Sequence, residues 1–184
     1  MKASTTSLPG VIVIEGDEHT DDRGSVAELY RVDRFAQLGI PDVFVQDNLT
    51  RSGRGAVRGL HYRIASQVKL VMVTEGEIYD VAVDVRRGSP TFGQWFGTQL
   101  TAENRRRVYI PPGFAHGYQA ISERADVVYK LTATFDRADD RAIRWDDPAL
   151  AIGWPLAASL LSARDAAAPL LADAALPAFE TLRR

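Results

Sequence analysis

The chain has 184 residues, of which 46% are hydrophobic and 25% charged, a composition typical of a soluble globular protein with one domain. The formal net charge of -2 excludes a globally basic surface for nucleic acid, and the absence of cysteine excludes disulfides, thiolate nucleophiles and zinc–thiolate sites. No apolar run is long enough for a signal peptide or a membrane span, so we expect a cytoplasmic protein without membrane contacts.

Short apolar runs broken by Gly, Pro, Asp and Asn follow a loose start over residues 1–10, and this pattern predicts mainly β structure. The expected strands, in chain order, are Val11–Glu15, Val26–Arg31, Val43–Asn48, Lys69–Glu75, Glu77–Asp84, Trp95–Leu100, Arg107–Ile110, Gly117–Ala120 and Asp126–Phe135. We expect one short helix over Asp33–Leu38. The Ala- and Leu-rich segment Pro155–Arg184, interrupted at Pro169 and Pro177, predicts short helices or turns packed on the β unit. Residues 1–184 are therefore expected to form a single β domain with a helical tail.

The strand expected at Glu77–Asp84 alternates strictly between two kinds of side chain. One face carries Tyr79, Val81, Val83 and Val85, and the other carries Asp80, Ala82 and Asp84. The small, acidic face either points to water or lines a polar cavity. The basic run Arg105-Arg106-Arg107 is interpreted as a solvated turn.

The chain has only three histidines, His19, His61 and His116, and this limits any metal site. His61 follows Arg-Gly-Leu and could act as a base near neutral pH, although a lone histidine is more commonly structural. His116 follows a Pro-Pro-Gly turn, where cupin barrels commonly place a metal ligand. The second histidine that such a site needs beside His61 is missing, because Tyr62 and Arg63 follow instead. We therefore predict no metal site.

Two further residues have both a structural and a functional interpretation. Tyr129 lies on an expected strand, where it either packs in the core or donates a proton into a cavity. Ser162-Ala163-Arg164-Asp165 matches a capping box that opens a short helix. A carboxylate at Asp165 could also orient a histidine that is distant in sequence.

Several blocks of sequence, in order from about Asp22 through Leu171, resemble the dTDP-4-dehydrorhamnose 3,5-epimerase family. These blocks are Asp22-Arg23-Gly24, Phe44-Val45-Gln46-Asp47-Asn48, Arg58-Gly59-Leu60-His61-Tyr62, Ser89-Pro90-Thr91-Phe92-Gly93-Gln94-Trp95, Ile110-Pro111-Pro112-Gly113-Phe114-Ala115-His116-Gly117 and Tyr129-Lys130. The resemblance implies a mainly β, cupin-type double-stranded β-helix (jelly roll) with short C-terminal helices. It also implies a homodimer that uses neither metal nor cofactor.

The resemblance also implies a role for each matching residue. His61 matches the catalytic base, Asp165 its carboxylate partner, Tyr129 the general acid on the opposite face of the sugar, and Lys69 the lysine near the ketone oxygen. The residues expected to contact the nucleotide-sugar are Arg23, Glu28, Gln46, Asn48, Arg58, His116, Asp140 and Arg164. Phe135 stands where a tyrosine usually stacks on the thymine. Further departures are Thr134 in place of a second tyrosine, Asp140 in place of glutamate and Arg63 in place of glutamine.

The implied activity is that of an isomerase, a carbohydrate epimerase acting on a dTDP-4-keto-6-deoxyhexose. It would remove a proton beside the C4 ketone and return one from the opposite face, inverting C3, C5 or both. The departures around the pocket leave open which carbon is inverted, since relatives from antibiotic deoxysugar pathways invert C3 alone or C5 alone. The Ala- and Arg-rich composition favours such a pathway and hence a 3- or 5-monoepimerase. Alternatives on the same barrel are a sugar-nucleotide 3,4-ketoisomerase, a non-catalytic sugar-nucleotide-binding cupin and a metal-dependent dioxygenase.

Overall fold

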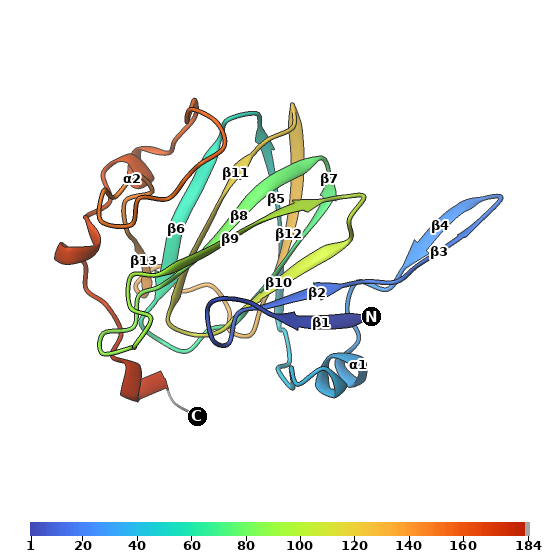
Figure 1. The fold of residues 1–184 in the computed structure, drawn as a ribbon, viewed down its shortest axis with the longest axis horizontal. Helices are drawn as coiled ribbons and strands as arrows, with labels where there is room; N and C mark the ends of the chain where they lie inside the picture. Colours follow the sequence, from blue (N-terminus) through green and yellow to red (C-terminus); the bar gives the residue numbers. More distant parts are fainter. Residues whose placement is uncertain (183–184) are drawn as a thin grey trace.

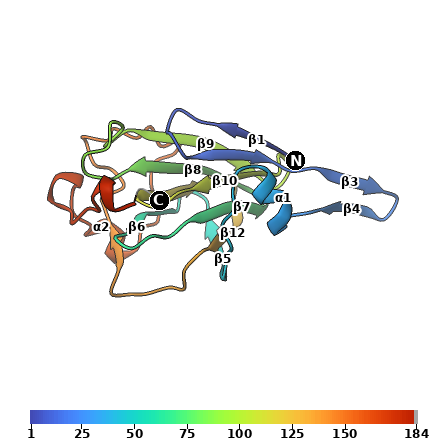
Figure 2. The same ribbon diagram turned by 90° about the horizontal axis from the view of Figure 1, so that it is seen from below.

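Two antiparallel sheets lie face to face in the computed structural model, which describes residues 1–182 (Figures 1 and 2). The six-stranded sheet has the order β1-β2-β10-β7-β12-β5, and the five-stranded sheet has the order β13-β6-β11-β8-β9. Neighbours in space are mostly distant in sequence, as in a jelly roll. The predicted mainly β jelly roll is therefore confirmed. The last two residues of the predicted 1–184 domain and tail lie outside the described residues.

The strands and helices are short. The six-stranded sheet comprises β1 (Lys2–Thr5), β2 (Ile12–Glu15), β10 (Arg106–Ile110), β7 (Lys69–Glu75), β12 (Arg124–Leu131) and β5 (Gln46–Gly53). The five-stranded sheet comprises β13 (Asp140–Ala142), β6 (Val57–Arg63), β11 (Phe114–Ala120), β8 (Glu77–Asp84) and β9 (Trp95–Thr101). A separate hairpin joins β3 (Glu18–Asp21) to β4 (Gly24–Ala27). The helices are α1 (Val32–Gln37), α2 (Ala163–Ala166) and the 3-10 turns η1 (Leu171–Asp173) and η2 (Phe179–Leu182).

Strand β8 shows why both faces of the five-stranded sheet are buried. Ala82 packs between the two sheets, in the same cluster as Val71 of β7 and Val127 of β12. Val81 and Val83 point the other way, into a second cluster with residues of the C-terminal part of the chain. The acidic face of β8 therefore points inward, where Asp80 and Asp84 are both buried. The acidic face, for which the alternation of side chains allowed either water or a cavity, is thus turned away from water.

The C-terminal part of the chain covers the outer face of the five-stranded sheet (Figure 1). Ile143, Leu150 and Leu171 are buried in the cluster beneath it, and the Trp95 indole of β9 donates a hydrogen bond to the Leu150 carbonyl at 2.9 Å. The segment also pairs with β6, since Val57 N–H donates to the Leu160 carbonyl at 3.0 Å. The expected packing of this tail on the β unit is confirmed, although much of it is irregular rather than helical.

The hairpin β3–β4 projects away from the two main sheets (Figures 1 and 2). It pairs only with itself, and its Val26 side chain is exposed. Helix α1 follows it and lies one residue earlier than the predicted Asp33–Leu38. None of the helices over residues 1–182 is long and apolar enough to cross a membrane.

Several strand predictions were wrong. Strands β1, β3, β6 and β13 were not predicted, and the strand expected at Val26–Arg31 is the earlier β4. Strand β5 begins at Gln46 rather than Val43, and β12 ends at Leu131 rather than Phe135.

The interpretation of Arg105–Arg107 as a solvated turn was also wrong. The turn covers residues 102–104 and Arg105 follows it, whereas Arg106 and Arg107 are in β10 and Arg107 is 1% exposed. The Arg107 Nη2 donates a hydrogen bond to the Glu28 carbonyl at 2.8 Å, at the root of the projecting hairpin. A buried arginine can thus join two distant segments by a hydrogen bond to a backbone carbonyl. A sequence of three consecutive arginines does not predict such a contact.

Candidate active site

A cavity of about 600 Å³ is lined by residues of both sheets and of the C-terminal part of the chain. The structure brings ten of the thirteen predicted site residues to its wall: Asn48, Arg58, His61, Lys69, His116, Tyr129, Phe135, Asp140, Arg164 and Asp165. These residues come from six strands, from the connection between β12 and β13, and from α2. The cavity is therefore the candidate active site.

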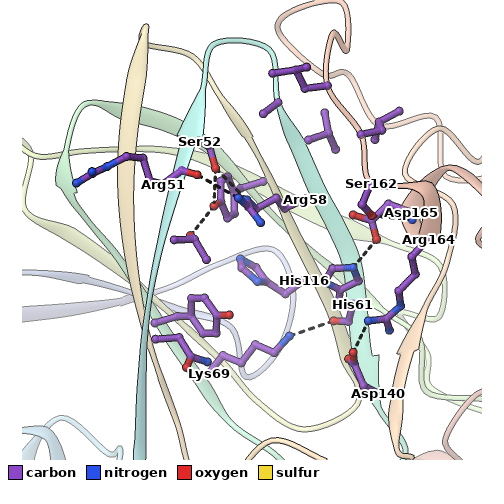
Figure 3. A pocket seen from close by; sticks show the side chains of 18 of the residues that line it. Arg51, Ser52, Arg58, His61, Lys69, His116, Asp140, Ser162, Arg164 and Asp165 are labelled. Atoms are coloured by element: carbon purple, nitrogen blue, oxygen red, sulfur yellow. Dashed lines mark hydrogen bonds and ion pairs between the residues drawn. The ribbon is translucent and has the colours of Figure 1, made fainter. Parts of the chain in front are cut away.

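A histidine–aspartate pair stands at one side of this cavity (Figure 3). His61 Nε2 lies 2.6 Å from Asp165 Oδ1, and Asp165 is buried at the start of α2. Burial by itself would raise the pKa of Asp165, but the hydrogen bond and charge of His61 lower it below the usual value. The carboxylate thus stays ionised beside the imidazole and leaves Nδ1 as the nitrogen available to accept a proton.

The Ser162–Asp165 segment forms both predicted contacts, the helix cap and the approach of the carboxylate to a distant histidine. The Ser162 hydroxyl accepts a hydrogen bond from the Asp165 backbone N–H at 3.0 Å, which is the capping contact. The same residue presents its side chain to His61. The cap therefore fixes the backbone from which the carboxylate reaches the imidazole.

The position of His61 depends on a close approach between β6 and β11. Gly59 has φ +115°, and a Cβ there would lie 2.6 Å from the Gly117 Cα. Only glycine fits both the dihedral angle and the gap. This contact places His61 directly opposite His116 in the ladder between the two strands.

A second histidine–aspartate pair is formed by His116 of the cavity wall. His116 Nε2 is 2.7 Å from Asp80 Oδ2, and both residues are buried. Sequence reasoning found His116 but missed Asp80 as its partner. The available signal was the inward acidic face of β8, which pairs with β11.

Two proton-bearing groups line the cavity from the six-stranded sheet. The Lys69 ammonium donates to the His61 carbonyl at 3.1 Å, and burial lowers the pKa of Lys69 to about 8 (Figure 3). Burial also raises the pKa of Tyr129, against a hydrogen bond from Asn48 that lowers it. The cavity thus combines a base, an ammonium group that can lose its proton and a phenol that keeps its proton at neutral pH.

Cationic side chains stand around this core. Arg58 donates from Nε to the Ser52 hydroxyl at 2.9 Å and from Nη2 to the Arg51 carbonyl at 3.0 Å (Figure 3). Arg164 is half-exposed and forms an ion pair with Asp140. Guanidinium groups held in this way suit an anionic, oxygen-rich ligand.

Three predicted residues do not line the cavity. Gln46 lies just beside it and hydrogen-bonds Asn48. Arg23 is at the tip of the projecting hairpin, where its side chain is 89% exposed and pairs with Asp21. Glu28 pairs with Arg34. Within one chain, the structure does not bring Arg23 or Glu28 to the other site residues.

No group of three or more His, Asp or Glu side chains that could hold a metal ion occurs over residues 1–182. His61 and His116 each have one carboxylate partner, and the two carboxylates are different. A site free of metal and cofactor stays a prediction.

The fold and the cavity define an acid–base site in a cupin-type barrel. Residues 5–173 match the family model for dTDP-4-dehydrorhamnose 3,5-epimerase. The chain is 51% identical to the dTDP-4-dehydrorhamnose 3,5-epimerase of Pseudomonas aeruginosa, over 95% of this chain and 98% of that one. The chain belongs to the dTDP-4-dehydrorhamnose 3,5-epimerase family, a family of isomerases that act as carbohydrate epimerases.

Solved structures agree with this assignment. The epimerase RmlC of Legionella pneumophila, solved with dTDP-4-keto-L-rhamnose, superposes with a TM-score of 0.93 at 45% identity, covering 97% of this chain and 98% of that one. NovW, a 4-keto-6-deoxy sugar epimerase from the novobiocin cluster of Streptomyces spheroides, superposes with a TM-score of 0.95 at 41% identity, covering 100% and 96%.

Proposed function

We propose that the chain epimerises a dTDP-4-keto-6-deoxyhexose at C3, C5 or both. The observation that carries this proposal is the His61–Asp165 pair, which faces a cavity that also holds Lys69 and Tyr129. A carbon beside a ketone loses a proton readily only when the resulting enolate is stabilised. The cavity offers the base, the stabilising cation and the returning acid together.

In this mechanism His61 Nδ1 removes the proton beside the C4 ketone. Asp165 holds the ring and stabilises the imidazolium that forms. Lys69, in its ammonium form, donates to the developing charge on O4 as in an oxyanion site. Tyr129 then returns a proton to the opposite face of the carbon, which inverts the centre and leaves a phenolate to be reprotonated.

The remaining residues are proposed to hold the nucleotide. Arg58 and Arg164 suit the diphosphate, because a guanidinium binds phosphate oxygens through two hydrogen bonds. Phe135 is 58% exposed at the cavity and offers a flat ring for the thymine. His116, Asp140, Gln46 and Asn48 complete the proposed set of contacts to the substrate.

We also propose a homodimer in which Arg23 and Glu28 reach the cavity of the partner subunit. The projecting hairpin supports this arrangement, since it carries both an exposed arginine and the exposed apolar side chain of Val26, and the exposed Leu29 follows it. A single domain over residues 1–184 and a cytoplasmic location stay predictions.

The test is an NMR time course of dTDP-4-keto-6-deoxyglucose and related 4-keto sugars in deuterated water, with C3 and C5 followed separately. The expected result is loss of the C3 or C5 proton signal with inversion, and His61→Asn abolishes both. Exchange at neither carbon with any substrate would refute the proposal. Movement of the carbonyl to C3 would show a ketoisomerase.

Tyr129→Phe distinguishes the two proton transfers. Because His61 still removes the proton, the variant should keep proton exchange but lose net inversion. An equal loss of exchange and inversion would mean that Tyr129 is not the opposite-face acid.

A further inference from the structure

The inner face of β5 carries a continuous row of polar side chains. Gln46, Asn48, Thr50 and Ser52 alternate with outward-facing, exposed neighbours along the strand. In the β5–β12 ladder, Asn48 lies directly opposite Tyr129, and Gln46 lies opposite Leu131. A polar row on a cavity-facing strand has to be satisfied by hydrogen bonds, and these bonds have a direction.

The backbone N–H of Phe135 fixes which side-chain groups along β5 donate and which accept. Phe135 N–H donates to Gln46 Oε1 at 2.7 Å, and a backbone amide can only donate. The oxygen of Gln46 is therefore fixed toward Phe135 and its NH₂ group points away. Gln46 Nε2 then donates to Asn48 Oδ1 at 3.0 Å. Each amide thereby fixes the orientation of the next, without any ambiguity between oxygen and nitrogen.

The series ends at the side-chain NH₂ of Asn48, directly across the ladder from Tyr129, and the Asn48 side chain lowers the pKa of the phenol. Because Asn48 Oδ1 is turned toward Gln46, the group that Asn48 can present to the Tyr129 phenol is its NH₂, which can only donate. A phenol proton lies in the plane of the ring, on one side of the oxygen or the other. With Asn48 on one side, the proton of Tyr129 occupies the other.

We propose that Asn48, oriented by Gln46, is a positioning residue for the proton donor Tyr129, holding the phenol so that its proton faces the substrate. The inference rests on the proposed function and assigns these two amides a role in proton return besides any contact to the nucleotide. The same NH₂ group stabilises the phenolate that remains after Tyr129 has given up its proton. It accordingly opposes the burial that makes this phenol a weaker acid.

This series of hydrogen bonds begins at Phe135, the residue proposed to stack on the thymine. The amide that orients Gln46 belongs to Phe135, whose ring lies at the cavity. The nucleotide end of the site and its proton donor are thus joined by two side chains.

The first experiment needs no substrate. A fluorinated tyrosine at position 129, which ionises well below the range of tyrosine, is titrated by fluorine NMR. Asn48→Ala should raise its apparent pKa by about one pH unit, a tenfold change in the ionisation constant. Asn48→Asp, of the same shape but without the donor, should raise it further. Gln46→Ala should give a smaller rise, and this more distant change serves if the Asn48 variants fold poorly.

The matched control is Asp47→Asn. Asp47 is the neighbour on the outward face of β5, where it pairs with Lys130. This variant should leave the titration unchanged. If the pKa at position 129 is the same in the Asn48 and Gln46 variants as in the wild type, the proposal is overturned.

The second experiment separates positioning from nucleotide binding. Asn48→Ala should lower kcat for net inversion about tenfold while retaining proton exchange at the carbon. A higher KM with unchanged kcat would mean that Asn48 only contacts the nucleotide, and this would overturn the proposal. Should the wild type exchange no proton with any 4-keto sugar, the proposed function fails, but the fluorine titration still decides the orientation of Tyr129.

Discussion

Lys69 provides the clearest pH dependence. Its ammonium group is buried beside the His61 carbonyl, and no carboxylate of residues 1–182 forms an ion pair with it. Burial is the largest cause of the fall in its pKa from 10.5 to about 8, and the charges of Asp140 and Asp80 oppose this fall only partly. Because the ammonium form stabilises the enolate in the proposed mechanism, activity should depend on how much of Lys69 is protonated.

The magnitude follows from the pKa of about 8. About 90% of Lys69 is charged at pH 7, and about 10% at pH 9. We therefore expect kcat/KM to fall about tenfold for each pH unit above 8, since this ratio reports the free enzyme. A lysine with the usual pKa would produce no such fall until about two pH units higher.

The assay is a pH profile of kcat/KM for epimerisation, together with carbon NMR of the lysine side chains. The chain has only three lysines, Lys2, Lys69 and Lys130, so three resonances suffice. In Lys69→Arg, any remaining activity should lose the fall near pH 8, because arginine stays charged. A Lys69 resonance that titrates near the usual lysine value would refute the reasoning, as would an unchanged profile in Lys69→Arg.

The free energy of unfolding should also depend on the ionisation of Lys69. Between about pH 8 and 10 the unfolded chain binds more protons at this lysine than the folded chain, so its contribution to stability rises with pH.

Three further predictions concern the His61–Asp165 pair, the helix cap at Ser162 and the predicted absence of a metal. Asp165→Asn should lower kcat about 100-fold or more, because a neutral amide cannot stabilise the imidazolium; steady-state kinetics at equal folded fraction measures this, and a near-normal kcat would contradict it. Ser162→Ala should lower the free energy of unfolding by about 1 kcal/mol through loss of the cap, with a smaller loss of kcat than Asp165→Asn; urea unfolding checks the first part, and an unchanged midpoint would count against it. Dialysis against a chelator should leave kcat unchanged, and a loss that added metal restores would show that the metal-free prediction is wrong.

The strands that could be predicted are those with one continuous apolar face. Strand β8 was bounded correctly because its valines alternate with small residues. Strand β6, which holds His61, was missed because polar residues line the cavity there and Gly59 interrupts the pattern. A functional strand thus breaks the hydrophobic alternation by which strands are recognised.

Most members of the site could be predicted, but only one of the contacts between them. Family resemblance gave His61 and Asp165 as partners, and the structure places them 2.6 Å apart although they are 104 residues apart in sequence. Neither the Asp80–His116 contact nor the order of the amides along β5 could be predicted, because both depend on strand register. Register is a property of strand pairing, which local sequence does not encode.

The two histidine–aspartate pairs show how burial assigns different roles to the same two residue types. His61 and His116 are opposite one another, and each has a carboxylate within 2.7 Å. The His61 side chain is 31% exposed over a 5% exposed aspartate, whereas His116 and Asp80 are 9% and 1% exposed. His61 can therefore take a proton from a ligand in the cavity and return it to solvent between turnovers. His116, enclosed on all sides but the cavity, is suited to hold a ligand oxygen in place. The enclosure of each histidine thus supports the proposed base at His61 and the proposed substrate contact at His116, and the sequence alone does not show it.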